Sequence, residues 1–157
     1  MTIDPNRQRQ IMGHFATGVT VVTTDGEAGS HGMTANAVAS LSLDPPLVLV
    51  AVDRRAAMLE YLHRNRCFAV NILRDDQEQL SRRFAVPGPK DFSNLATIPG
   101  TTGAPILAGA VAHLDCRLLE VLPGGDHEIF IGQIVAGECT GGRPLIYYDG
   151  NYRRLAE

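Results

Sequence analysis

Short runs of β-branched and apolar residues, each closed by a turn signal, constrain most strongly what this 157-residue chain can fold into. Residues 18–24 (GVTVVTT) end at an Asp-Gly pair, and residues 47–52 (LVLVAV) follow an Asp-Pro-Pro break. Glycine accepts the positive φ that a tight turn requires, and proline interrupts a regular strand. Strands that follow one another through such turns pair antiparallel, so the pattern favours a mainly β fold over a doubly wound α/β sheet.

The rest of the chain divides into further strand-like segments and short helices. We expect six to eight strands and two or three helices, arranged as an antiparallel Greek-key barrel. Residues 86–105 hold four prolines and three glycines, which predicts a long irregular and functional loop. Nine segments have strand-like composition, of which we expect six to eight to form strands; they lie at 18–24, 30–36, 38–43, 47–52, 67–73, 111–121, 128–136, 144–148 and 152–155. Helical patterns lie at 5–14, capped by Asp4, at 56–64, and at 76–84, opened by Asp75 and Glu78.

Length, charge and cysteine use limit the class of protein. We expect a single domain over residues 1–157, which is an ordinary domain length. The net charge of -3 and the lack of a basic run argue against a nucleic-acid partner. No stretch approaches the roughly 20 apolar residues that span a bilayer, so we expect no membrane contact. Three widely spaced cysteines without CxxC spacing favour reduced thiols and a cytoplasmic location.

Several common kinds of site are missing from the sequence. Neither G-x-G-x-x-G nor G-x-x-x-x-G-K-[ST] occurs, so a nucleotide must be held by another route. The five histidines show no H-x-x-x-H spacing, so we expect no metal site. Ser30-His31 lacks the G-x-S-x-G elbow of a serine hydrolase.

Residues 32–48 (GMTANAVASLSLDPPLV), preceded by 15–23 (FATGVTVVT), closely resemble the flavin reductase-like family. Residues 67–73 (CFAVNIL) and 147–155 (YYDGNYRRL) are similar to later landmarks of that family, in the usual order. The resemblance implies an α+β, mainly β fold, the antiparallel Greek-key split β-barrel with a few short helices. It also implies an NAD(P)H:flavin oxidoreductase that transfers a hydride from NADH or NADPH to FMN or FAD, forms a homodimer, and passes reduced flavin to a separate flavin-dependent monooxygenase.

The residues themselves are compatible with flavin binding. An isoalloxazine ring has carbonyl acceptors, an N3–H donor and apolar faces, so its site needs backbone amides and short polar side chains. Alternation along a strand would place Thr34 and Asn36 on one face, and Ser40 and Ser42 together on another. The same alternation is also typical of a strand whose polar face only meets solvent. The segment assigned to the flavin comprises Met33, Thr34, Ala35, Asn36, Ala37, Ser40, Leu41 and Ser42.

The flavin phosphate requires a cationic or amide-rich partner. The residues Asp53, Arg54, Arg55 and Ala56 provide two guanidinium groups at the start of a predicted helix, where free amides also favour an anion. Solvated surface charges are the alternative explanation for both arginines. The family often has serine or threonine here, where this chain has alanine and methionine, so the sequence leaves FMN against FAD open.

The residues that contact the nicotinamide dinucleotide are assigned mainly by the resemblance to the family. His127 is predicted to contact the dinucleotide through a hydrogen bond, with Asp126 orienting it. Tyr148, Tyr152 and Arg154 are predicted to close the site from the C-terminus, and Phe84 and Phe92 are predicted to stack near the flavin or the bound nicotinamide. Packed core aromatics with an exposed arginine would show the same pattern. Two other functions remain open: a noncatalytic flavin-binding protein, and a flavoenzyme that keeps FMN and reduces another acceptor.

Overall fold

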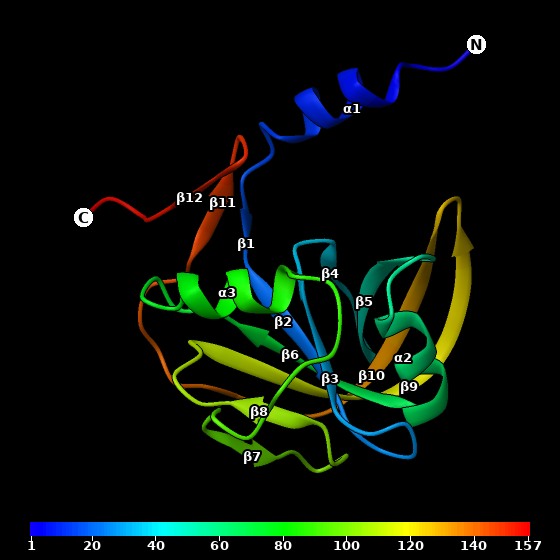
Figure 1. Cartoon of the computed structure of the whole chain (residues 1–157), viewed down its shortest axis with the longest axis vertical. Helices are drawn as coiled ribbons and strands as arrows, with labels where there is room; N and C mark the ends of the chain where they lie inside the picture. The colour runs from blue at the N-terminus through cyan, green and yellow to red at the C-terminus, as the bar shows by residue number, and fades with distance from the viewer.

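A computed structural model describes residues 1–157 as three helices and twelve strands (Figure 1). The main sheet has seven strands in the order β3-β2-β6-β9-β10-β5-β4, and two small sheets have the orders β1-β11-β12 and β7-β8. The helices are α1 (Pro5–Met12), α2 (Met58–Asn65) and α3 (Glu78–Ala85). The strands are β1 (Thr17–Gly18), β2 (Thr20–Thr24), β3 (His31–Ala35), β4 (Val38–Leu43), β5 (Pro46–Asp53), β6 (Cys67–Ile72), β7 (Thr97–Pro99), β8 (Pro105–Leu107), β9 (Ala112–Gly124), β10 (His127–Cys139), β11 (Ile146–Tyr148) and β12 (Asn151–Arg153).

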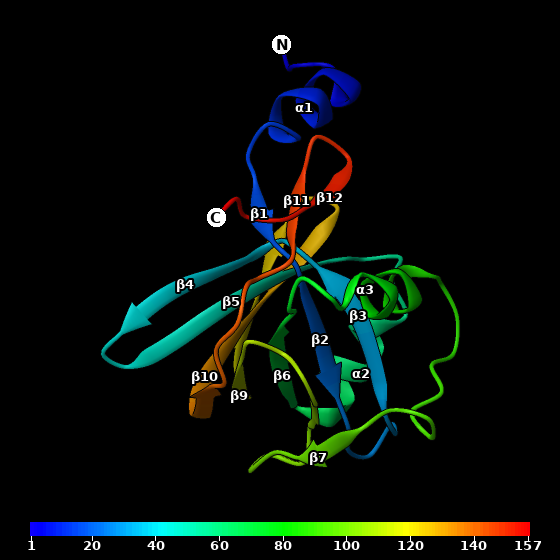
Figure 2. The same cartoon turned by 90° about the vertical axis from the view of Figure 1, so that its left-hand side faces the viewer.

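The main sheet curls into a barrel that does not close. Its two edge strands, β3 and β4, follow each other in the chain and are joined by Asn36 and Ala37. Every strand pairing is antiparallel, which confirms the predicted fold class. The hairpin of β4 and β5 projects from the body (Figure 2). The split between the two edges therefore falls within the segment assigned to the flavin.

Two apolar cores hold the sheet in shape. The barrel interior packs Val50, Phe68 and Phe130 against Met58 and Leu62 of α2, all at most 1% exposed. A second core lies outside the barrel, between α3, β2 and the C-terminal strands, and includes Phe84 and Leu145. Because β2 lies between the two cores, every residue of this strand is buried, which explains its continuous apolar and threonine composition.

Helix α1 forms for local reasons and buries nothing. The Asp4 carboxylate accepts hydrogen bonds from the amides of Asn6 and Arg7 at 2.9 and 3.1 Å, and Pro5 occupies the first turn. No residue of α1 is buried, and the helix extends away from the barrel (Figure 1). The predicted cap is confirmed, and the helix is left without a packing partner within this chain.

The predicted start of the third helix is wrong. The D-x-x-E pattern placed it at Asp76, but α3 begins at Glu78, and its N-cap Gln77 makes no side-chain capping bond. The Asp76 carboxylate instead accepts from Arg74 Nε at 2.8 Å, and the Asp75 amide donates to the carbonyl of Arg143. Tertiary pairing of this segment with the C-terminal part of the chain thus replaces the local capping box.

The strand count was also too low, and the long loop is not wholly irregular. The small strands β1, β7, β8, β11 and β12 contain only two or three residues each. Two of them, β7 and the beginning of β8, lie inside the 86–105 segment. The unpredicted strands β7 and β8 are too short to show a periodicity in the sequence, whereas β11 and β12 overlap the segments predicted at 144–148 and 152–155.

The three thiols differ in burial, which gives a direct test of the fold. Cys67 and Cys116 are buried, and desolvation raises the pKa of the Cys116 thiol to about 12, whereas Cys139 is exposed at the end of β10. We expect one fast-reacting thiol with Ellman's reagent in the native protein, and three after denaturation, because the thiolate is the reactive form. The Cys139→Ser variant should lose the fast phase. A fast phase that survives in this variant would contradict the burial of the other two.

Candidate flavin site at the split of the barrel

Three neighbouring cavities follow the β3–β4 segment. The loop cavity, of about 610 Å³, is lined by β3, the turn between β5 and α2, and residues 84–90. The helix cavity, of about 360 Å³, is lined by β3, α3 and the C-terminal tyrosines. The mouth cavity, of about 460 Å³, is lined by residues 15–18 and by β4. Met33 lines both the loop and the helix cavities, and Asn36 lines both the helix and the mouth cavities. A continuous stretch of backbone therefore borders all three, and it lies at the free edge of the sheet.

The predicted flavin segment divides among these cavities. Thr34 and Ala35 line the helix cavity, and Ser40 lines the mouth cavity. Ala37, Leu41 and Ser42 lie outside the three cavities. Leu41 is 45% exposed, and Ser42 is half-buried. Flavin contact by these three residues stays a prediction.

Hydrogen bonding shows which polar groups of the segment remain free. The Thr34 hydroxyl donates to the carbonyl of Ser81 in α3 at 2.5 Å, and the Thr20 hydroxyl donates to the carbonyl of Ala35 at 2.6 Å. Asn36 is exposed and its amide makes no side-chain hydrogen bond. Of the predicted polar side chains, Asn36 therefore keeps its donors and acceptor for a ligand, while Thr34 keeps only acceptor capacity.

The simple alternation predicted for the two serines is wrong. Ser40 pairs with Val48, but Ser42 pairs with Leu47, so one extra residue is inserted in β4 at Leu41. Such a β-bulge breaks the period of two and bends the strand. The two serines consequently lie in different surroundings, and only Ser40 lines a cavity.

The turn between β5 and α2 has the features of an anion site. The Arg55 guanidinium and amide both bond to the Asp53 carboxylate, with Nη2–Oδ2 at 3.0 Å and N–Oδ1 at 2.8 Å. These contacts lower the pKa of Asp53 to about 2, so the pair is ionised at neutral pH. Helix α2 starts only at Met58, and its N-cap Ala57 offers no side-chain partner. The Leu59 amide donates to the carbonyl of Ala56, so the amides of Ala57 and Met58 are left for a ligand. Asp53, Arg55 and Ala56 all line the loop cavity.

Arg54 has a different environment from its neighbour. Its Nε donates to the carbonyl of Gly125 at 3.1 Å, and its amide donates to the carbonyl of Asp126. Glu128, which also bonds His63 at 2.7 Å, lies 4.0 Å from the Arg54 guanidinium. We call the turn between β5 and α2, residues 53–57, the proposed phosphate turn, or phosphate turn for short. Arg54 links this turn to the β9–β10 turn and does not line the loop cavity.

The β9–β10 turn carries His127 next to the phosphate turn. His127 is the first residue of β10 and is the cross-strand partner of Asp53. Its Nδ1 lies 2.7 Å from the Asp126 carboxylate, and this hydrogen bond lowers the pKa of Asp126. Because Nδ1 is held by Asp126, Nε2 is the ring nitrogen available to a ligand. This is the arrangement that the orienting role predicted for Asp126 requires.

The predicted aromatic residues separate into three groups. Phe84 lines the loop cavity, where its ring lies against Gly32, and Tyr152 lines the helix cavity, where its hydroxyl is 2.7 Å from Ser81 Oγ. Phe92 packs on Phe84 and lines none of the three cavities. Tyr148 packs edge-on against His14, outside them.

Sequence reasoning missed several residues that line these cavities. Tyr147, the cross-strand neighbour of Tyr152, occupies the position that had been predicted for Tyr148. The alternation of β11 could have distinguished these two adjacent tyrosines. His31 and Lys90 line the loop cavity together with the 85–88 loop, and no local pattern connects them. Arg154 is exposed beyond the end of β12.

The arrangement fits a flavin. A free sheet edge supplies unpaired backbone groups for the ring carbonyls and N3–H, and the half-buried Met33 supplies apolar surface. An uncapped helix start and Arg55 face the same cavity and suit a phosphate. No three histidine, cysteine, aspartate or glutamate side chains gather closely enough to hold a metal ion. No helix combines the length and apolar character needed to cross a membrane.

The fold is a split β-barrel with three cavities along the split, and its function has to be inferred from this site and from related proteins. The chain belongs to the flavin reductase like domain family, which matches residues 12–156. An NADH-dependent flavin reductase from Rhodococcus sp is 39% identical over 98% of this chain and 88% of the relative. The reductase component of a 4-nitrophenol 4-monooxygenase/4-nitrocatechol 2-monooxygenase from Rhodococcus opacus is 39% identical over 96% of this chain and 80% of the relative.

Solved structures of related proteins share this fold. The NADH:FAD oxidoreductase SgcE6 of Streptomyces globisporus C-1027 superposes with a TM-score of 0.92 at 40% identity, covering 100% of this chain and 98% of that one. Another structure of that enzyme, in complex with NAD and FAD fragments, also has a TM-score of 0.92, at 39% identity over 99% and 97% of the two chains. The flavin reductase PheA2 has a TM-score of 0.91 at 40% identity over 99% and 100%.

Proposed function

We propose that this protein is an NAD(P)H:flavin oxidoreductase that reduces FMN or FAD and supplies the reduced flavin to a separate monooxygenase. The observation that carries the proposal is the row of three cavities along the free β3–β4 edge, one of which is also lined by the phosphate turn. The relatives named NADH-dependent flavin reductase, and the reductase component of a monooxygenase, support both halves of the proposal. Each of the three cavities is partly open to solvent, which suits a flavin that enters and leaves.

The chain's own residues bind and orient in this proposal. The flavin accepts a hydride from the reduced nicotinamide, and the cofactors themselves carry the electronic change. The segment Met33–Ala37 and Ser40 hold the flavin ring, and Arg55 with the α2 start holds the phosphate. His127, oriented by Asp126, contacts the nicotinamide dinucleotide. Holding two rings in contact is what a site must supply for such a transfer, so no acid or nucleophile of the protein is required.

The test is a two-by-two assay of NADH and NADPH with FMN and FAD, read as loss of the absorbance of the reduced nicotinamide. We expect catalytic turnover with added flavin in at least one combination, and NADH to be preferred, as in the named relatives. Flavin that exchanges freely during turnover would identify it as a substrate. Failure to accelerate NADH or NADPH oxidation with either flavin would contradict the proposal.

The phosphate assignment makes its own prediction. Arg55→Ala should raise the apparent dissociation constant for flavin about three- to tenfold. The factor is modest because an exposed charge is screened by water. Arg55 is 89% exposed in its side chain. Arg64→Ala is the matched control, because Arg64 lies on α2, is also exposed, and lines none of the three cavities. An unchanged flavin constant in Arg55→Ala would remove this residue from the site.

We also propose a homodimer. Support comes from apolar side chains that this chain leaves uncovered on its projecting parts: Ile11, Met12 and Phe15 at the end of α1, and Leu43 at the tip of the β4–β5 hairpin, which is 91% exposed (Figures 1 and 2). Burial of such side chains against a second copy would be favourable. Light scattering at micromolar concentration should give twice the 16.9 kDa mass of the chain. A monomer at that concentration would contradict the proposal.

We propose in addition that residues 1–157 work as one domain in the cytoplasm. The family match over residues 12–156 supports the single domain. The three cysteines are all free thiols, which suits a reducing compartment.

A further inference from the structure

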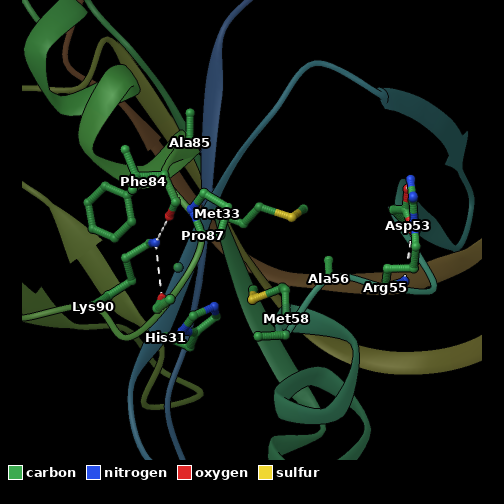
Figure 3. Close-up of a pocket in the computed structure, with 14 residues that line it drawn as sticks. His31, Met33, Asp53, Arg55, Ala56, Met58, Phe84, Ala85, Pro87 and Lys90 are labelled. Atoms are coloured by element: carbon green, nitrogen blue, oxygen red, sulfur yellow. Dashed lines mark hydrogen bonds and ion pairs between the residues drawn. The ribbon is translucent and has the colours of Figure 1, made fainter.

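Arg54 lies between two residues that line the loop cavity but does not line it itself. Asp53 and Arg55 border the cavity (Figure 3), and their side chains bond to each other. The Arg54 side chain instead reaches the β9–β10 turn and is 48% exposed. The proposed function therefore gives a role to Arg55 and none to Arg54.

Arg54 bonds to both carbonyls of the β9–β10 turn. The turn consists of Gly125 and Asp126, because β9 ends at Gly124 and β10 begins at His127. The Arg54 Nε donates to the carbonyl of Gly125 at 3.1 Å, and the Arg54 amide donates to the carbonyl of Asp126 at 3.0 Å. A single residue of the phosphate turn thus fixes the orientation of both peptide groups.

The Arg54 guanidinium lies near a carboxylate that is itself anchored. The Glu128 carboxylate lies 4.0 Å from the Arg54 guanidinium and 2.7 Å from His63 Nε2. Its side chain is only 15% exposed, so water screens this attraction less than it would at an open surface. His63 lies on α2, and its ring packs edge-on against the buried Phe130. These contacts connect the β9–β10 turn to the core of the barrel.

The turn held by Arg54 carries the contact that orients His127. The Asp126 carboxylate bonds to His127 Nδ1 at 2.7 Å, and its side chain is otherwise 90% exposed. Gly125, the residue before it, has a φ of 69° and no side chain to restrict its backbone. Without the bond from Arg54 the turn would adopt several orientations, and the Asp126–His127 contact would form in only some of them.

We propose that Arg54 is a positioning residue for the nicotinamide dinucleotide. It holds the β9–β10 turn so that Asp126 keeps the His127 ring with Nε2 directed to the ligand, and it does not bind the flavin phosphate. The inference rests on the proposed function and deepens it. The adjacent residues Arg54 and Arg55 then serve different ligands, the first through a hydrogen-bonded turn and the second through its charge.

The first experiment measures the tautomer of His127 in the free protein, so it does not depend on flavin reduction. Nitrogen NMR of the neutral imidazole distinguishes a protonated from a bare ring nitrogen, and the hydrogen bond to one nitrogen sets the state of the other. The wild type should show a protonated Nδ1, bonded to Asp126, and a bare Nε2. Arg54→Met keeps the aliphatic stem and should move both signals toward those of Asp126→Ala. Signals that stay at their wild-type positions in Arg54→Met would overturn the inference.

The second experiment separates dinucleotide use from flavin binding. Arg54→Met should lower kcat/KM for NADH about three- to tenfold and leave the flavin dissociation constant within about twofold. Arg54→Lys keeps the charge but not the Nε–H donor, and it should bind flavin as Arg54→Met does. Tighter flavin binding by the lysine variant would assign Arg54 to the flavin phosphate and overturn the inference. Arg117→Ala, which changes an exposed arginine in the middle of β9, is the control and should match the wild type.

A double-mutant cycle tests whether Arg54 acts through His127. If it does, adding Arg54→Met to the His127→Ala variant should lower kcat/KM for NADH by less than about twofold. A further three- to tenfold loss in that variant would show that the two residues act independently, and would overturn the inference. A purely structural role would instead lower the melting temperature and weaken flavin binding and NADH use together.

These outcomes separate the inference from the proposed function. A protein inactive with every flavin would contradict the proposed function, while the tautomer of His127 in Arg54→Met would still test the positioning. An active enzyme in which Arg54→Met changes neither the tautomer nor NADH use would overturn the inference and leave flavin reduction intact.

Discussion

Phe130→Ala should destabilise the protein by about 3–5 kcal/mol, the typical cost of removing a fully buried aromatic ring. Phe130 is 0% exposed and lies in β10 opposite Val50 of β5 and Val121 of β9. Its ring also meets His63 of α2 at a centroid distance of 5.2 Å. The loss should lower the melting temperature by about 6–20 °C for a domain of this length, measured by calorimetry or circular dichroism.

Two controls locate this effect in the core. Phe130→Leu keeps most of the buried volume and should cost distinctly less than Phe130→Ala. Leu155→Ala removes a side chain that is 53% exposed near the C-terminus, and it should stay within about 0.5 kcal/mol. If Phe130→Ala melted within one or two degrees of the wild type, β10 would not pack in the barrel as the structure shows.

His127→Ala should lower kcat/KM for NADH by about ten- to hundredfold, the loss of a hydrogen bond to a charged or strongly polar group. The flavin dissociation constant, measured by quenching of flavin fluorescence, should change by less than about twofold. The difference is expected because His127, although it pairs with Asp53 beside the phosphate turn, lines none of the three cavities assigned to the flavin.

The neighbouring carboxylate refines this prediction. Asp126→Ala should reduce NADH use less than His127→Ala, because it only frees an imidazole whose Nδ1 is held at 2.7 Å. His14→Ala, which changes an exposed histidine on the far side of Tyr148, serves as the control. Equal loss of flavin affinity and NADH use in His127→Ala would assign His127 a structural role.

Most of the sheet could be predicted because its signals are local. The Asp-Gly pairs and the Asp-Pro-Pro break mark turns wherever they occur, and the runs between them are long enough to show strand composition. The start of α3 could not be predicted in this way. There the Asp76 carboxylate accepts from its neighbour Arg74, and the Asp75 amide donates to the carbonyl of Arg143, a long-range contact that only the folded chain creates.

The site shows the same division. The phosphate turn and the β3–β4 segment are continuous in sequence, so their residues could be assigned together, and most of them line a cavity. The bulge at Leu41 depends on how β4 pairs with β5, and no residue type in the segment predicts it. His31 and Lys90 meet only because the 85–90 loop folds over β3. Cavities built across distant segments are therefore where the sequence was least informative.

A crystal structure of the protein soaked with FMN would test most directly whether the gap in the barrel is a flavin site. The account predicts ring density along residues 33–40, with the phosphate between Arg55 and the first turn of α2. Side chains of the protein filling that gap, with flavin elsewhere or absent, would contradict it.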